Sequence, residues 1–143
     1  MKKAIRFIVL VLALFSLAAC SKTTLNTIAV TGDWEQTKIE RWVDGVCIST
    51  TYPQNWKKEY YYHVQSDGVI VRTIQEPMSI IGTSETGSWL IDGDTFVIRF
   101  TSGVETYYFE HTGLLKLVLK KVGHDYVEYI TLEKYTPVPP VVE

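Results

Sequence analysis

The clearest indication of the fold is the segment Asp92-Gly93-Asp94-Thr95-Phe96-Val97-Ile98-Arg99-Phe100. In its second half, Phe96, Ile98 and Phe100 alternate with residues that are mostly polar. Because successive side chains of a strand point to opposite faces, this alternation predicts a β-strand with one buried face. The Asp-Gly-Asp that precedes it is typical of a tight hairpin turn with glycine at a positive φ. The segment therefore predicts an antiparallel strand that follows a hairpin.

The same pattern recurs along the chain. Turn sequences occur about every ten residues, at 44–45, 66–68, 92–94, 102–103, 112–113 and 123–125, as in antiparallel sandwiches and barrels. We predict eight strands, at 32–42, 60–65, 69–75, 87–91, 95–101, 105–111, 114–121 and 126–135. An even number of hairpin-linked strands can close without leaving a free edge. The predicted fold is therefore all-β, an eight-stranded antiparallel up-and-down barrel.

Composition agrees with this fold. Of the 123 residues that follow Cys20, 40 are Val, Ile or Thr and 16 are aromatic, and these types favour strands over helices. This length suits one domain with its own core. The same part of the chain has 11 basic and 16 acidic residues. Its net charge of −5 excludes a basic nucleic-acid-binding domain.

The first 20 residues have the form of a bacterial lipoprotein signal. Lys2, Lys3 and Arg6 precede an apolar run, 7–17, which is too short to span a bilayer comfortably. The run ends in Leu17-Ala18-Ala19-Cys20, which resembles the lipobox of bacterial lipoproteins. The resemblance implies that residues 1–19 are removed and that Cys20 carries the lipid. The alternative is an ordinary signal peptide with an incidental cysteine.

The sorting position and the two flanking segments complete the domain prediction. Ser21 follows the lipidated cysteine, and a residue other than Asp there resembles the outer-membrane sorting pattern. We expect a lipid anchor in the outer membrane, on the periplasmic face. Residues 20–30 are Thr-rich without a helical period and are predicted to be a tether, residues 31–135 the barrel, and residues 136–143 a Pro-rich tail.

Three motifs, in their order and spacing, resemble the small lipocalin-like domains of bacterial lipoproteins. They are Gly32-Asp33-Trp34, the segment Tyr62-His63-Val64-Gln65-Ser66-Asp67-Gly68, and Gly87-Ser88-Trp89-Leu90-Ile91-Asp92-Gly93-Asp94-Thr95-Phe96. The chain departs from the family in two ways. No arginine matches the one that closes over the tryptophan in many lipocalins. The face of Trp34 also carries Gln36, Lys38 and Glu40, so either a bulge brings Ile39 inward or the interior is partly polar.

Strand parity divides the connections between the two ends of the barrel. The turns 66–68, 92–94 and 112–113 share one end, and the connections 43–59, 76–86, 102–104 and 122–125 share the other. The first two of the second group are longer than hairpins need, which predicts a functional mouth. Both chain ends fall at the tight-turn end. A lipid on Cys20 would therefore hold the closed end, with the mouth pointing away from the membrane.

Aromatic and apolar residues assigned to the mouth are the candidate ligand contacts. They are Trp42, Tyr52, Trp56, Tyr60, Tyr62, Met78, Ile80, Trp89 and Phe100. Such side chains suit either a hydrophobic lid or a ligand entrance. An eight-stranded barrel is just wide enough to be filled by side chains or to hold one small ligand, and the bulky inward candidates Trp34, Tyr62, Trp89, Phe96, Ile98, Phe100 and Leu117 could fill most of it.

The sequence thus leaves two functions open. The first is a lipid-anchored binding module for a small apolar or amphipathic ligand at the long-loop end. The second is a filled barrel that contacts another protein of the cell envelope.

We expect neither enzymatic activity nor a cofactor or metal. His63, His111 and His124 form no pair at a metal-ligand spacing. Asp92 and Asp94 are explained by their hairpin turn. Cys47 is the one thiol that remains once Cys20 is acylated, and Val46 and Ile48 beside it favour a buried thiol over a reactive or intermolecular one.

Overall fold

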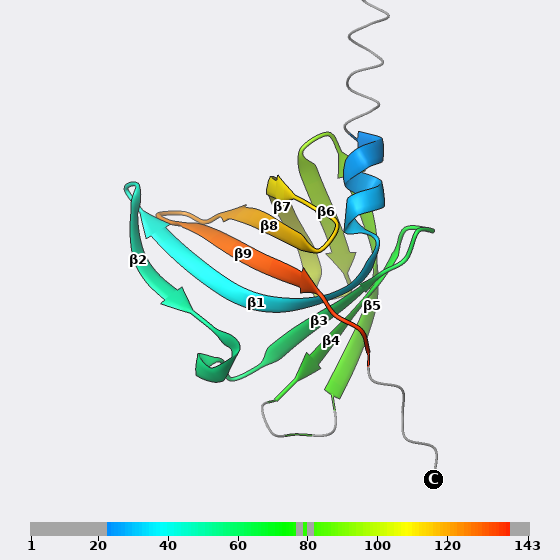
Figure 1. The fold of residues 1–143 in the computed structure, drawn as a ribbon, viewed down its shortest axis with the longest axis horizontal. Helices are drawn as coiled ribbons and strands as arrows, with labels where there is room; N and C mark the ends of the chain where they lie inside the picture. Colours follow the sequence, from blue (N-terminus) through cyan, green and yellow to red (C-terminus); the bar gives the residue numbers. More distant parts are fainter. Residues whose placement is uncertain (1–22, 77–78, 80–81, 138–143) are drawn as a thin grey trace, which may run out of the picture.

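The chain folds into a closed antiparallel β-barrel in the computed structural model, which describes residues 23–76, 79 and 82–137 (Figure 1). Its strands are β1 (Gly32–Val43), β2 (Val46–Thr51), β3 (Glu59–Val64), β4 (Val69–Gln75), β5 (Gly82–Asp92), β6 (Thr95–Phe100), β7 (Gly103–Thr112), β8 (Lys116–Val122) and β9 (Val127–Lys134), with a 3₁₀ turn, η1 (Pro53–Asn55), between β2 and β3.

The sheet order is β2-β1-β3-β4-β5-β6-β7-β8-β9, and β1 also pairs with β9. Eight strands, β1 and β3 to β9, therefore close the barrel, as predicted.

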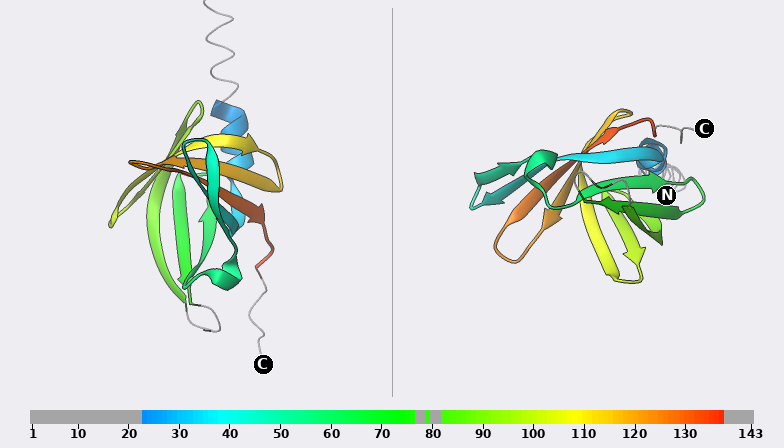
Figure 2. Two further views of the ribbon diagram at one scale, coloured as in Figure 1. Left: turned by 90° about the vertical axis from the view of Figure 1, so that its left-hand side faces the viewer. Right: turned by 90° about the horizontal axis from the view of Figure 1, so that it is seen from below.

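One edge of β1 is shared by two strands. Its residues Gly32–Glu35 pair with β3 and its residues Ile39–Val43 pair with β2, while its other edge pairs with β9. The prediction of a single long loop over 43–59 is wrong. Asp44 and Gly45 both have positive φ (50° and 77°), so they form a tight hairpin that returns β2 onto β1 at once. β2 projects beside the barrel (Figure 2).

A bulge brings the first strand into register with the core. The pairing of β1 with β9 shifts between Gln36 and Lys38, which lets Ile39 pack against the core. Gln36 is nevertheless buried. Both expectations for this face therefore hold, since the bulge exists and the interior is partly polar.

Residues 23–30 form a helix, so the expectation of a non-helical tether is wrong for this segment. Two threonine hydroxyls, of Thr27 and Thr31, each donate to the carbonyl four residues earlier, at 2.7 and 2.9 Å. Asn26, Ala29 and Val30 are buried, at the i, i+3, i+4 spacing of one helix face. Tertiary packing thus overrides the weak helix propensity of the segment.

The helix covers the tight-turn end of the barrel (blue in Figure 1). The side-chain amide of Asn26 donates to the carbonyl of Gly93 at 2.6 Å, and the amide of Gly93 donates to the hydroxyl of Thr23 at 3.1 Å. The indole of Trp34 donates to the carbonyl of Val30 at 2.7 Å. This end of the barrel is therefore closed.

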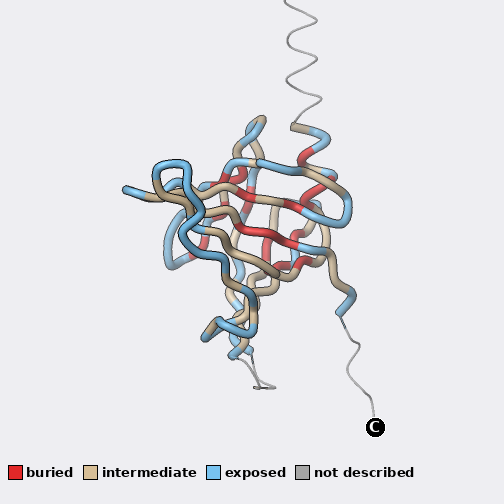
Figure 3. Tube along the Cα trace, turned by 60° about the vertical axis from the view of Figure 1, so that its left-hand side comes forward, coloured by how far each residue is buried: buried red, intermediate tan, exposed pale blue. Residues whose placement is uncertain are grey.

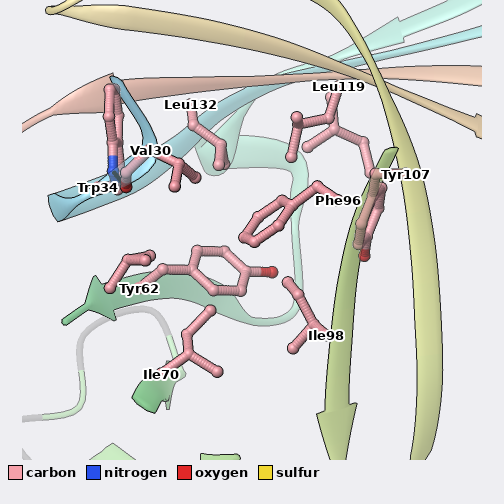
Figure 4. A pocket seen from close by; sticks show the side chains of 11 residues that line it. Val30, Trp34, Tyr62, Ile70, Phe96, Ile98, Tyr107, Leu119 and Leu132 are labelled. Atoms are coloured by element: carbon pink, nitrogen blue, oxygen red, sulfur yellow. Dashed lines mark hydrogen bonds between the residues drawn. The ribbon is translucent and has the colours of Figure 1, made fainter. Parts of the chain in front are cut away.

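Side chains fill the barrel. Buried residues gather in its middle (Figure 3), and every predicted core residue, including Trp34, Phe96 and Leu117, is buried. The side chains of Figure 4 point toward one another and leave about 10 Å³ between them, room for about one water molecule. The interior therefore has no space for a ligand among the described residues.

Cys47 is exposed, which corrects the expectation of a buried thiol. β2 lies outside the barrel and, in the described part of the chain, pairs with β1 alone. Its two faces are therefore open to solvent, and Val46 and Ile48 are exposed as well. Among the described helices, none has both the length and the apolar character that crossing a bilayer requires.

Candidate functional site

The inward-facing positions of the barrel change from apolar to charged toward the open end. On β4, Arg72 follows Ile70 two residues later, and on β8, Lys121 follows Leu119 in the same way. On β7, Glu105 lies two residues before the buried Tyr107. Since inward positions alternate along each strand, these charges share the interior side of the sheet with the core.

These residues form an open cup of about 290 Å³ at the mouth. Its walls come from six strands and comprise Gln36, Ile39, Tyr60, Tyr62, Arg72, Ile74, Glu105, Tyr107, Lys121, Glu128 and Ile130. We call this site the polar cup. Tyr62 and Tyr107 lie at its floor, since both also line the filled apolar interior.

Arg72 is the centre of the polar cup. Its guanidinium donates to Glu85 at 2.6 Å and to Glu105 at 2.7 Å, and it lies 4.2 Å from the centre of the Phe100 ring. The Arg72 side chain is only 12% exposed. Burial opposes the charge, but the two carboxylates outweigh it and raise the pKa of Arg72 above its ordinary value. Arg72 is therefore charged at every physiological pH.

The floor tyrosines stay protonated. Burial raises the pKa of Tyr62 to about 12, and burial likewise raises the pKa of Tyr107. The charges of Arg72 and Glu105 act on the pKa of both hydroxyls. The floor thus has neutral phenol groups next to charged side chains.

The formal charges of the polar cup balance. In its lining, two basic side chains, Arg72 and Lys121, face the carboxylates of Glu105 and Glu128, and Glu85 pairs with Arg72 beside them. Glu128 also pairs with Arg41 at the rim, at 3.3 Å. Hydrogen-bonding groups and ring faces therefore line the site. In the described residues, no group of three His, Cys, Asp or Glu side chains could hold a metal ion.

The predicted site residues lie in several places. Tyr60 and Tyr62 line the polar cup, and Phe100 supports its arginine. Tyr52 is exposed and Trp56 is half-buried beside η1, where its indole donates to Thr51 at 2.9 Å.

Trp42 and Trp89 lie away from the polar cup. Trp42 lines a separate groove between the β1–β2 and β8–β9 turns and stacks edge-on against Tyr129 at 6.0 Å. Trp89 lies near the closed end, where its indole donates to the carbonyls of Gln65 and Val69. Met78 and Ile80 lie outside the described residues.

The site predicted from the sequence does not include the charged residues of the polar cup, although the strand pattern indicates their inward positions. Arg72 lies between Ile70 and Ile74 in a period-two strand, so its position predicts an inward side chain. The same spacing identifies Glu105 from Tyr107, and Lys121 from Leu119. The predicted ligand contacts are all aromatic or apolar, so they do not include the charged residues at inward positions.

A basic residue closes over the ring of Trp34 after all. Lys134, near the end of β9, places its ammonium 4.5 Å from the centre of the Trp34 ring and donates to the carbonyl of Thr31 at 2.6 Å. Lys134 thus covers the tryptophan ring, a contact for which the sequence has no matching arginine.

No protein-family model matches the chain, and a search of curated proteins found no match. The fold alone therefore defines the class. The chain is a closed eight-stranded antiparallel barrel with one additional strand, an arrangement consistent with the lipocalin-like fold.

Proposed function

We propose that the chain is a lipid-anchored, lipocalin-like binding module that takes a small amphipathic ligand with a cationic group in the polar cup. The observation that carries the proposal is the division of the barrel interior. Side chains leave only about 10 Å³ empty in the apolar part, whereas the polar cup has an open volume of about 290 Å³. A ligand of this barrel thus has room at the mouth, against charged and phenolic groups.

The chemistry of the polar cup favours a cation. The formal charges of its lining balance, so the preference comes from its aromatic rings. Tyr60, Tyr62 and Tyr107 present π faces, which attract a cation and also give apolar contact to the rest of the ligand. A purely apolar ligand would displace water from the charged side chains without replacing its hydrogen bonds, which is unfavourable.

Two probes with the same ring and opposite charge test this preference. We expect 2-phenylethylamine to shift the NMR resonances of Tyr60, Tyr62 and Tyr107 in the chain 21–143. Phenylacetate should bind at least about tenfold more weakly, which corresponds to about 1.4 kcal/mol. Glu105→Gln should weaken amine binding by a similar factor. Glu110→Gln, an exposed change on the same strand, is the matched control and should leave binding unchanged.

Equal binding of both probes would show that charge does not select the ligand. Absence of any shift at the three tyrosines would exclude the polar cup as the site.

The lipid anchor is the second part of the proposal, and the segment Leu17-Ala18-Ala19-Cys20 supports it. The proposed location is the periplasmic face of the outer membrane. Cys20→Ser should move the protein from the membrane fraction to the soluble fraction, because the acyl chains are its attachment. Fractionation followed by mass spectrometry of the N-terminal peptide checks both the location and the acylation. Unchanged membrane partition of the variant would contradict the anchor.

A protein-interaction module is the second candidate function, and β2 favours it. This strand is exposed over nearly its whole length, carries Val46 and Ile48 in solvent, and in the described part of the chain pairs along one edge. Such an edge can accept an additional strand from an envelope protein. Binding that Ile48→Lys abolishes and Glu105→Gln leaves intact would identify this function.

A further inference from the structure

The outward face of the helix 23–30 is apolar although nothing in the described structure packs on it. Leu25 and Ile28 are 66% and 62% exposed, and their i, i+3 spacing puts them on one side. The opposite side carries the buried Asn26, Ala29 and Val30. The helix has no charged residue. An eight-residue helix with one face in the barrel core would ordinarily present polar side chains to water.

The neighbouring turn after β7 extends this apolar surface. Leu114 and Leu115 are 72% and 75% exposed. Leu25, Ile28 and Leu114 line one shallow groove between the helix and the turn. Leu115 is the next residue of the same turn. We call these four residues at the closed end the closed-end patch. Contiguous exposed apolar residues on a folded domain mark a contact surface.

The position of the proposed lipid identifies the occupant of this surface. Thr23, the first described residue of the helix, is three residues after Cys20, so the chain between them spans at most ~11 Å. A lipid on Cys20 therefore keeps the closed-end patch within a short distance of the bilayer. The polar cup opens at the opposite end of the barrel, where β4 ends and β7 begins.

We propose that the closed-end patch inserts into the surface of the bilayer that holds the lipid on Cys20. The inference rests on the proposed anchor and adds an orientation to it. The barrel is seated on its helix and its β7–β8 turn, with the polar cup facing away from the lipid. Aliphatic side chains on a short uncharged helix suit the boundary between headgroups and acyl chains.

Fluorescence quenching by a lipid-borne nitroxide tests the orientation. The acylated protein is placed in phosphatidylcholine vesicles that contain an acyl-chain doxyl label. Leu115→Cys carries an environment-sensitive fluorophore in a Cys47→Ser background. The control site is Val104→Cys, which is 63% exposed near the β6–β7 turn at the other end. We expect several-fold stronger quenching at position 115 than at position 104.

A second variant separates insertion from mere proximity to the anchor. The double variant L25S/I28S should reduce the quenching at position 115 several-fold, while acylation and membrane partition stay unchanged. Equal quenching at positions 104 and 115, or quenching at position 115 that L25S/I28S leaves unchanged, would overturn the patch while the anchor stands. Absence of acylation on Cys20, seen by mass spectrometry, would overturn both.

Discussion

Replacing Trp34 with alanine is expected to lower the free energy of unfolding by about 3–5 kcal/mol, the range for truncating a buried tryptophan. The side chain is fully buried, and its indole donates to the carbonyl of Val30. Lys134 also covers its ring. The substitution removes packing from the core and the contact that holds the end of the helix 23–30 on the barrel.

Urea denaturation, followed by circular dichroism, measures this loss. Trp56→Ala is the matched control, because Trp56 is half-buried and lies beside η1 outside the core. Its cost should be below about 1 kcal/mol. Similar losses for the two variants would mean that Trp34 does not occupy the centre of the core.

Arg72→Met should lower the free energy of unfolding by about 2–3 kcal/mol. The change leaves the carboxylates of Glu85 and Glu105 without their shared cation. Breaking a fully buried ion pair costs about 3–5 kcal/mol. The value here is smaller because the glutamate side chains keep 30% and 26% of their exposure and water screens them in part.

The triple variant R72M/E85Q/E105Q should recover at least half of that loss, because it removes the unpaired charges together with the arginine. Arg41→Met, which breaks the exposed pair with Glu128, is the control and should cost less than about 1 kcal/mol. Equal losses for Arg41→Met and Arg72→Met would contradict a central role for Arg72 in the polar cup.

Much of the fold could be predicted because barrel strands leave a local pattern. Phe96, Ile98 and Phe100 alternate at period two and all three are buried in the structure. The turn at Gly93 has the positive φ that its sequence predicts. Even the bulge in β1 could be anticipated, since polar residues at Gln36 and Lys38 conflicted with a buried face.

The missed features depend on contacts between distant segments. The helix 23–30 is held by the hydrogen bond from Asn26 to Gly93, and no local pattern predicts that contact. Cys47 lies on a strand outside the barrel, so the apolar residues beside it do not mean that its thiol is buried. Trp89 is an exception, because its place three residues before the 92–94 turn already indicates the closed end and not the mouth.

The closure of the barrel between β1 and β9 has a consequence for how the chain reaches its native state. The two strands pair Trp34 with Lys134 and Trp42 with Val127. One edge of the first strand therefore has its hydrogen-bonding partner only when the last strand is present. Contacts between residues so far apart in sequence must overcome a large loop-closure entropy and slow folding. A chain that emerges with its N-terminus first therefore cannot close the barrel until β9 has emerged. The barrel should stay open until its final strand is released.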